Sequence, residues 1–132
     1  MSARGTSLLG DRPAIANIAV KDLEVAREFY EDTLGLTPAG EEGDEVIMFR
    51  SGDSTINVYR SEYAGTNKAT ALTWDVGSDL NEVVHALQEK GVAFEHYDMP
   101  GLTRQGDVHV AGNLKVAWFK DPDGNILNVF SA

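Results

Sequence analysis

One local pattern occurs twice along the chain: a strand, a helix and three further strands. Val20-Lys21-Asp22-Leu23 in the first copy corresponds to Val76-Gly77-Ser78-Asp79-Leu80 in the second, where one extra residue precedes the helix. The last strands also correspond, since Thr55-Ile56-Asn57-Val58-Tyr59 is similar to Ile126-Leu127-Asn128-Val129-Phe130. This duplication predicts an α+β fold of two tandem βαβββ modules, about residues 13–64 and 68–132, which form a single domain after an N-terminal tail of residues 1–12.

In the first module, the residue pattern predicts a strand over 14–20, and Asp22 is a suitable N-cap for the helix that follows. Apolar residues at helical spacing predict that helix over 23–34, and Gly35 stands where a residue of positive φ commonly ends a helix. Phe29 and Tyr30 lie on its apolar stripe, so we expect them to pack in the core. Turns that contain Gly and Asp then separate three short strands, over 37–40, 45–50 and 54–60.

The second module repeats this order with a longer connection. A strand is predicted over 70–76, and Asp79 with Glu82 forms an acidic variant of a capping box before a helix that ends at Gly91. Residues 98–113 are an insertion relative to the first module, rich in Gly and Pro turn signals. They are interpreted as a lid, a dimer-contact hairpin or a plain solvated connector. The remaining strands of this module are predicted over 92–97, 114–119 and 125–130.

Charge and composition restrict the partners of the chain. Its 132 residues include 11 Lys and Arg against 21 Asp and Glu, a formal net charge of −10 that repels nucleic acid phosphates and anionic lipid. No apolar run is long enough to span a membrane, and residues 1–12 lack signal-peptide character. The absence of cysteine excludes disulfides and thiolate chemistry. We therefore expect a cytoplasmic protein with a small-molecule partner, and neither nucleic acid nor membrane as a partner.

Two motifs carry a family resemblance. A helix with Phe29-Tyr30 and Leu34-Gly35 follows the first strand, and Asp121-Pro122-Asp123-Gly124-Asn125 precedes the last one. Together they resemble the vicinal oxygen chelate superfamily, which includes glyoxalase I, extradiol dioxygenases, and fosfomycin- and bleomycin-resistance proteins. The resemblance covers residues 13–132 and implies a curved mixed sheet around a cleft, often completed by a homodimer. From its residues alone, the segment 121–125 is interpreted as a tight turn without a chemical role.

The resemblance also implies where a metal would bind, and this chain departs from that pattern. Metal-dependent members use one ligand from the first and one from the last strand of each module, typically His, Gln or Glu. These positions correspond to Ile15 and Asn57 in the first module and to Ala71 and Asn128 in the second. Two of these side chains have no donor atom, and two are neutral amides that do not offset the charge of a divalent cation. We therefore expect no metal and no other cofactor, and neither glyoxalase nor dioxygenase chemistry.

The histidines are the remaining candidates for acid–base chemistry. His85 lies in the second helix beside its apolar stripe and is interpreted as structural. His96 shares a strand face with Phe94, which favours a structural role, while His109 belongs to the insertion. Two alternatives remain for these residues: His96 and His109 form a paired site, or either of them acts as a general acid or base.

Strand alternation predicts which residues line the cleft. They combine uncharged polar groups with apolar and aromatic surface, which suits a neutral or mildly polar organic ligand. Trp74 alternates to the opposite face and is expected beneath the helices, whereas Trp118 is either a ligand platform or a core residue. Asn57 and Asn128 either contact the ligand or hydrogen-bond to each other. The predicted ligand-binding residues are Asn17, Asn57, Tyr59, Thr73, Asp75, Trp118, Asn128 and Phe130.

Three functions are compatible with these observations. The first is a metal-free binding protein, similar to glyoxalases and bleomycin-resistance proteins, that holds a small hydrophobic or aromatic molecule, with a cationic ligand favoured by the acidic charge. The second is a metal-independent isomerase or lyase in which Asp75, His96 or His109 acts as acid or base, while Asn57 and Asn128 stabilise an enolate-like oxygen. The third is a divergent metalloenzyme, a lyase or dioxygenase, with ligands contributed by a partner chain.

Overall fold

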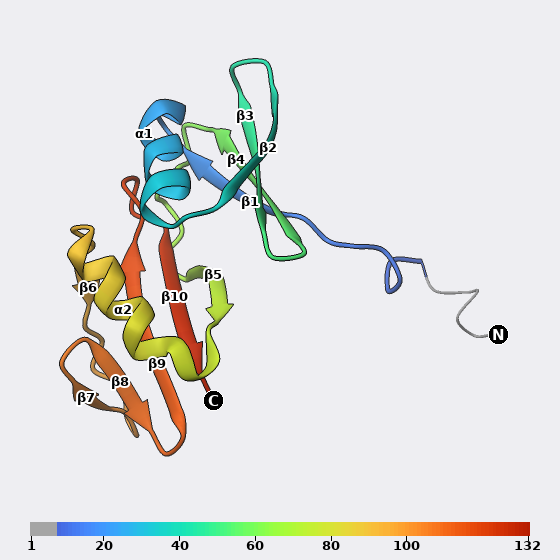
Figure 1. Ribbon diagram of the computed structural model, residues 1–132. Coiled ribbons are helices and arrows are strands. Elements are labelled where there is room, and N and C mark those ends of the chain that lie inside the picture. The colour runs from blue at the N-terminus through green and yellow to red at the C-terminus, as the bar shows by residue number, and fades with distance from the viewer. Residues whose placement is uncertain (1–7) are drawn as a thin grey trace.

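The computed structural model describes residues 8–132, which form two modules that follow each other in the sequence, with residues 8–15 extending away from the first (Figure 1). The first module contains β1 (Ala16–Val20), α1 (Leu23–Arg27), a π-helical turn η2 (Glu28–Thr33), β2 (Thr37–Glu42), β3 (Val46–Ser51) and β4 (Ser54–Arg60). The second contains β5 (Thr70–Asp75), a 3₁₀ turn η3 (Gly77–Asp79), α2 (Leu80–Glu89), β6 (Phe94–Glu95), β7 (Thr103–Gln105), β8 (Val108–Ala111), β9 (Leu114–Lys120) and β10 (Ile126–Ser131).

Each module has its own mixed sheet. The strand order in the first is β1-β4-β3-β2, with β1 parallel to β4. The order in the second is β5-β10-β9-β8-β7, with β5 parallel to β10 and with β6 also paired to β9. The α+β class and the two βαβββ modules are therefore confirmed, and the strands are divided between sheets of four and six.

The longer connection of the second module interrupts one strand. β6 pairs with Phe119 and Trp118 of β9, and β8 pairs with residues 114–116 of the same strand. Both run antiparallel along the same side of β9, so β6 and β8 are two parts of one interrupted strand. Between them the chain leaves the side of β9 over residues 96–107, here called the excursion, which includes β7, the strand that pairs with β8 at the edge of the sheet. The strand predicted over 92–97 is therefore wrong in length, because only Phe94–Glu95 pair before the chain departs.

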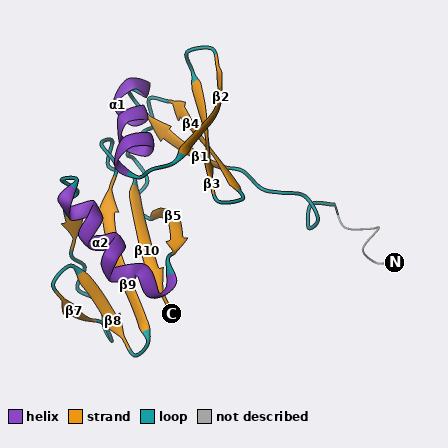
Figure 2. Cartoon of the chain, in the orientation of Figure 1, coloured by secondary structure: helices purple, strands orange, loops and turns teal. Residues whose placement is uncertain are grey.

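One apolar core lies between the sheets and the helices. Ile18 and Val20 of β1, and Leu127 and Val129 of β10, alternate toward the helices and are buried. Helix α2 lies across β9 and β10 and buries its apolar stripe there (Figure 2). Trp74 packs against the same core, which confirms its predicted place beneath the helices. Both modules thus contribute to one core.

The first helix begins and ends as its sequence predicts. Asp22 is its N-cap, and the Asp22 carboxylate accepts the backbone N–H groups of Glu24 at 2.9 Å and Val25 at 3.3 Å. Gly35 follows the π-helical turn with φ of 81°, a left-handed conformation that glycine adopts without steric penalty. The predicted helix is therefore confirmed in extent, although its second half is wound as a π-helix.

The capping box predicted for the second helix is wrong. Asp79 forms no capping hydrogen bond through its side chain, because η3 occupies the residues directly before α2. A 3₁₀ turn already orders the backbone at this end of the helix. The carboxylate that acts here belongs to Asp75, which accepts the backbone N–H of Gly77 at 3.1 Å.

A buried hydrogen-bond network joins the two modules. The Tyr30 hydroxyl donates to Asp121 Oδ2 at 2.7 Å, and Asn125 Nδ2 donates to the same oxygen at 2.8 Å. Asn125 Nδ2 also donates to the backbone oxygen of Ala19 at 2.8 Å. Burial, together with the negative charge of Asp121, raises the pKa of Tyr30 above its ordinary value. The segment 121–125, interpreted from sequence as a turn alone, is therefore also the connection between the modules.

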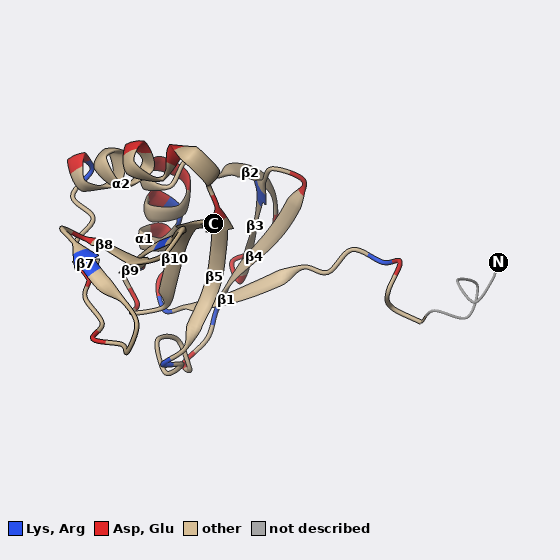
Figure 3. Cartoon of the chain, turned by 90° about the horizontal axis from the view of Figure 1, so that it is seen from below, with Lys and Arg blue, Asp and Glu red and all other residues tan. Residues whose placement is uncertain are grey.

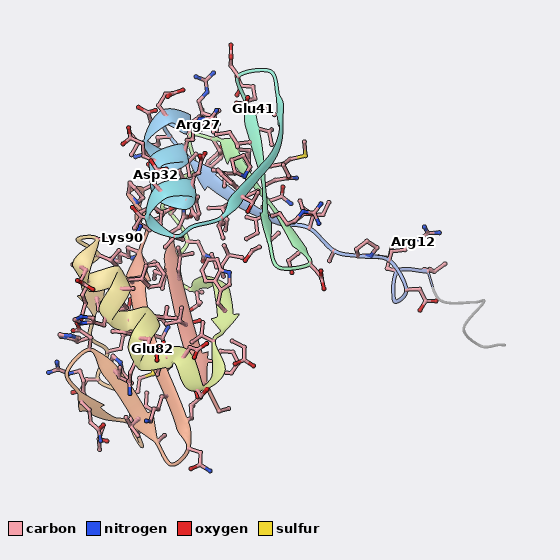
Figure 4. The ribbon with its side chains drawn as sticks, viewed as in Figure 1. Arg12, Arg27, Asp32, Glu41, Glu82 and Lys90 are labelled. Atoms are coloured by element: carbon pink, nitrogen blue, oxygen red, sulfur yellow. The ribbon has the colours of Figure 1, made fainter. Side chains whose placement is uncertain are left out.

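Further contacts cross the same junction. Lys90 Nζ, at the end of α2, donates to the backbone oxygen of Asp32 at 2.8 Å (Figure 4). Trp74 Nε1 donates to Ser51 Oγ at 2.8 Å, which connects β5 to the end of β3. The relative position of the modules is thus held by polar contacts as well as by the shared core.

Charged residues are unevenly distributed over the second module. Acidic residues lie along α2, whereas β5 and β10 together contain one charged residue, Asp75 (Figure 3). In residues 8–132, no helix has the length and apolarity that crossing a membrane requires. The strands that carry several of the predicted ligand residues are therefore nearly uncharged.

Replacing Tyr30 with Phe tests the network between the modules. Tyr30→Phe removes one donor from a buried carboxylate, so we expect the free energy of unfolding to fall by about 1–3 kcal/mol. Urea denaturation of the two proteins measures this difference. Tyr63→Phe, at a residue that is 71% exposed, is the control and should change the stability little. An equal effect of both substitutions would show that the network does not stabilise the junction.

Replacing Gly65 with Ala tests the close approach between the loop after β4 and the turn at 121–125. A Cβ at Gly65 would lie 2.0 Å from the backbone oxygen of Asp123, whereas a Cβ at Gly52 meets nothing within 4 Å. Both glycines have positive φ, so Gly52→Ala should cost about 1–2 kcal/mol through backbone strain alone. We expect Gly65→Ala to destabilise the protein clearly more in urea denaturation. Equal losses would contradict the close approach.

Candidate functional site

The predicted ligand residues lie on the face of each sheet that points away from the helices, here called the helix-free face. In the first module this face carries Asn17 and Ala19 of β1, in register with Asn57 and Tyr59 of β4. The intervening Ile18 points the other way and is buried. Asn57 Nδ2 donates to Asn17 Oδ1 at 3.3 Å, so the structure brings two of the predicted residues together.

In the second module, two rows of side chains cross the helix-free face from β5 to the opposite edge. One row consists of Thr73, Asn128, Trp118 and Glu95. The other consists of Asp75, Phe130, Val116 and His109. Paired residues of neighbouring strands point to the same side of a sheet, so the members of each row are neighbours. This face therefore holds Thr73, Asp75, Trp118, Asn128 and Phe130 of the predicted set.

Three aromatic rings pack against one another on this face. The ring centroid of Trp118 lies 4.9 Å from that of His109 and 5.2 Å from that of Tyr97, both in edge-to-face geometry. Trp118 is 9% exposed, and its Nε1 donates to Thr70 Oγ1 at 3.2 Å. The Trp118 side chain thus lies on the helix-free face, whereas its neighbours Ala117 and Phe119 point into the core beneath the helices. We call Tyr97, His109, Trp118 and the adjacent Asn128 the aromatic–amide cluster.

Several polar atoms of this cluster are buried without a hydrogen-bond partner. Among the described residues, these atoms are the Tyr97 hydroxyl, His109 Nδ1 and Asn128 Oδ1, and Asn57 Oδ1 in the first module is in the same condition. A bond between the Asn57 and Asn128 amides needs one of their oxygens as acceptor, so the alternative in which they bond to each other is wrong. Buried polar groups in native proteins are nearly always paired, so these atoms are candidates for ligand contact.

A groove of about 480 Å³ lies where the two modules meet. It is lined by Ile15 before β1 and by Thr73, Trp74 and Asp75 of β5, among others. Ile15 is 51% exposed at this place. Because Thr73 and Asp75 also belong to the helix-free face, the groove extends from the junction to that face.

The three histidines lie in different environments. His85 is exposed on α2, with its Nε2 3.4 Å from Glu89, and lies outside the site. His96 and His109 are brought together, with ring centroids 6.4 Å apart. His109 is only 1% exposed, whereas His96 is half exposed, and its Nε2 lies 2.6 Å from Asp107 Oδ1. The predicted proximity of His96 and His109 is therefore present, but only His109 belongs to the buried cluster.

The excursion is held in place through Asp107. Gln88 of α2 donates through Nε2 to Asp107 Oδ2 at 2.6 Å, opposite the contact with His96. The hydrogen bond with His96 lowers the pKa of Asp107 most strongly, and Gln88 and the positive charge of Arg104 lower it further, although partial burial opposes them. Residues of the insertion pair as the β7–β8 hairpin, so the plain connector among the three interpretations of 98–113 is wrong.

The positions that hold a metal in related proteins do not fit a divalent cation here. Ile15 and Ala71 have no donor atom, and Asn57 and Asn128 supply only neutral amide oxygens. Within the described part of the chain, no three His, Asp or Glu side chains gather into a group that could hold a metal ion. The donor set of this face therefore suits an organic ligand better than a metal.

The candidate acid and base do not lie together. Asp75 and His109 stand at opposite ends of one row, on β5 and β8. Three strand steps of about 4.8 Å separate them, which is roughly 14 Å. One small ligand cannot contact both groups at hydrogen-bonding distance.

Sequence reasoning missed two residues of this face. Glu95 pairs with Trp118 in register, and its Oε1 lies 3.6 Å from Lys120 Nζ. Strand alternation puts Glu95 on the face opposite to that of His96, and this signal could have identified it. Tyr97 lies just beyond β6, where the same alternation places it on the face of Glu95, but no sequence pattern indicates that its ring contacts Trp118. The position of Tyr97 depends on the path of the excursion.

Comparison with known proteins gives a family and a fold. The family model for the glyoxalase/bleomycin resistance protein/dioxygenase superfamily matches residues 12–129. No curated protein is similar enough in sequence to match the chain.

Several solved structures share the fold at low sequence identity. TnmS3, an antibiotic binding protein from Streptomyces sp. CB03234, is 19% identical with a TM-score of 0.70, and the match covers 95% of this chain and 98% of TnmS3. Lactoylglutathione lyase from Agrobacterium tumefaciens is 14% identical with a TM-score of 0.69, covering 92% and 94%. A glyoxalase/bleomycin resistance protein/dioxygenase from Alicyclobacillus acidocaldarius is 15% identical with a TM-score of 0.69, covering 92% and 91%. Such identities establish a common fold and leave the ligand undetermined.

Replacing Asp107 with Asn tests the anchoring of the excursion. Because the pKa of Asp107 is lower in the folded protein than in the unfolded chain, its contacts stabilise the fold above about pH 4 and are lost as the pH falls through the folded-state pKa. We expect hydrogen-exchange protection of β8 to decrease on acidification in the wild type. Asp107→Asn should start with lower protection and lack this pH dependence.

Asp98→Asn is the matched control, since it removes the same charge from the same segment. It should keep the pH dependence of the wild type. If Asp107→Asn behaves like this control, then the Asp107 contacts do not hold the hairpin.

Proposed function

The chain belongs to the glyoxalase/bleomycin resistance protein/dioxygenase superfamily, and from this premise we propose that it binds a small hydrophobic or aromatic molecule on the helix-free face. The binding uses the side chains of the protein, without a metal at the usual family positions. The proposed ligand-binding residues are those predicted from the sequence: Asn17, Asn57, Tyr59, Thr73, Asp75, Trp118, Asn128 and Phe130.

The observation that carries the proposal is the aromatic–amide cluster of the second module. Binding sites for small molecules combine apolar and aromatic surface with a few polar groups that fix orientation. Trp118 supplies the aromatic surface, and Asn128 beside it has a buried oxygen with free hydrogen-bonding capacity. Thr73 continues the same row into the groove at the junction. These groups give a ligand both a stacking surface and specific contacts.

The chemistry of the donor set supports binding without a metal. A divalent cation needs anionic or imidazole ligands to replace its water shell, and the residues at the family positions are Ile15, Asn57, Ala71 and Asn128. The acidic net charge favours a neutral or cationic ligand over an anion. A protein of the same fold is described as an antibiotic binding protein, so binding of a small organic molecule is a use to which this fold is put.

The geometry supports binding more than catalysis. An isomerase or lyase that uses two of these residues as acid and base needs both within reach of one substrate. Asp75 and His109 are three strands apart, and His96 is bound to Asp107 in the excursion.

The proposal also includes a homodimer in the cytoplasm. A second copy would extend the helix-free face, and a chain without cysteine suits a reducing compartment. Sedimentation analysis tests the dimer.

Screening neutral and cationic aromatic compounds tests the proposed function. We expect thermal shift and ligand-observed NMR to detect binding by the wild-type protein, with affinity unchanged by a chelator or by added zinc. Trp118→Leu removes the stacking surface and should weaken binding about fivefold or more, since aromatic contacts of this kind contribute about 1 kcal/mol beyond buried area.

Tyr63→Leu is the matched control, because Tyr63 is an exposed aromatic residue outside the site. It should bind like the wild type. Failure of every compound to bind, or binding only by protein that holds stoichiometric metal, would contradict the proposed function.

A further inference from the structure

The least expected feature of the second module is a set of buried polar atoms that no protein group satisfies. His109 is 1% exposed and Asn128 is 9% exposed, yet His109 Nδ1 and Asn128 Oδ1 have no partner among the described residues. The Tyr97 hydroxyl beside them is buried and unpaired as well. A chain that needed only a stable core would place apolar side chains at these positions, because an unpaired buried polar group is destabilising. The pattern therefore calls for a functional explanation.

The hydrogen bond at the other nitrogen of His109 determines where its proton lies. The backbone N–H of Tyr97 donates to His109 Nε2 at 3.0 Å, so this nitrogen presents its lone pair. A neutral imidazole with an acceptor at Nε2 carries its proton on Nδ1. The unpaired Nδ1 of His109 is thus a buried N–H donor, and the hydrogen bond from the Tyr97 backbone to Nε2 fixes this tautomer.

The unpaired atoms surround one aromatic surface. Asn128 is paired directly across from Trp118 on neighbouring strands. The His109 ring lies 4.9 Å from Trp118, and the Tyr97 ring lies 5.2 Å from Trp118 and 6.4 Å from His109. A donor at His109, an acceptor at Asn128 and a hydroxyl at Tyr97 are thus grouped around the indole.

We propose that His109 and Asn128 select a planar aromatic ligand that carries both a hydrogen-bond acceptor, bound by His109 Nδ1–H, and a donor, bound by Asn128 Oδ1. This inference rests on the proposed binding function and names the ligand class and the residues that choose it. Because His109 and Asn128 lie on β8 and β10, on either side of β9, a carbonyl oxygen and a hydroxyl or amide N–H at opposite ends of an aromatic ring have this chemistry. Glu95, in the same row as Trp118, disfavours an anionic ligand.

Tyr97 is the side chain that opens the site. The unpaired atoms are sealed from solvent, so a ligand reaches them only when a covering group moves. Tyr97 is held by its backbone N–H, while its hydroxyl makes no hydrogen bond in the described structure. Its ring can therefore rotate away from Trp118 and His109 without breaking a side-chain hydrogen bond. The ligand then takes the place of the Tyr97 ring and pairs with the exposed atoms.

The test compares ligand binding and stability in two variants with matched controls. The probes are 4-hydroxybenzamide, which carries a carbonyl and a hydroxyl at opposite ends of one ring, and toluene, which has neither group. His109→Leu removes the ring donor, and Asn128→Leu removes the acceptor at similar volume. His85→Leu and Asn81→Leu make the same changes at exposed positions of α2 and should bind like the wild type.

We expect the wild type to bind 4-hydroxybenzamide at least about tenfold more tightly than toluene, and both cluster variants to lose this preference. Asn128→Leu should have an equal or higher thermal midpoint, because it removes an unpaired buried polar atom. A merely structural role predicts the opposite change in stability. Nitrogen NMR of His109 should show the Nδ1–H form, and ligand should shift the indole signal of Trp118.

The failures are distinguishable. If both probes bind equally to the wild type, or if the cluster variants keep the preference for 4-hydroxybenzamide, then the inference is overturned while the proposed binding function stands. A lower thermal midpoint for Asn128→Leu would likewise overturn it, since the oxygen would then be structural. If neither these probes nor any compound of the wider aromatic panel binds, the proposed function itself is contradicted.

Discussion

The carboxylate of Asp121 holds the two halves of the duplicated chain in one relative position. A buried carboxylate is stable only when its oxygens are hydrogen-bonded. Asp121 obtains these bonds from Tyr30 in the first module and from Asn125, whose amide also reaches the backbone of Ala19. If the modules moved relative to each other, these bonds would break inside the core. The groove at the junction and the shared apolar core therefore both depend on a turn of five residues.

The two modules differ in one respect that decides where the candidate site lies. In the first module, β2 pairs with β3 as one strand with a single irregularity. In the second, the equivalent edge is divided into β6 and β8, and the excursion between them brings Tyr97 and His109 against Trp118. Duplication thus produced two similar sheets, and an interruption in one of them produced an asymmetric cluster. The polar atoms of that cluster are buried without hydrogen-bond partners among the described residues, which reduces stability locally.

Local patterns predicted the elements well where the physical signal is itself local. The N-cap at Asp22 and the glycine after the first helix depend on neighbouring residues, and both were predicted correctly. Alternation placed Trp74 beneath the helices for the same reason. The capping box at Asp79 failed because a 3₁₀ turn replaced the expected helix start. The bond between Asn57 and Asn128 failed because each residue is positioned by its own strand pairing, and Asn57 bonds to Asn17 instead.

By itself, the sequence determined the duplicated order of strands and helices, the acidic charge, and the lack of suitable metal ligands at the family positions. These properties follow from residue type and periodicity, which act over a few neighbouring residues. Only the tertiary structure decided that the turn at 121–125 joins the modules and that Tyr97 and His109 pack on Trp118. Such contacts join residues distant in the chain, and they form only when sheet register and the path of the excursion place those residues together.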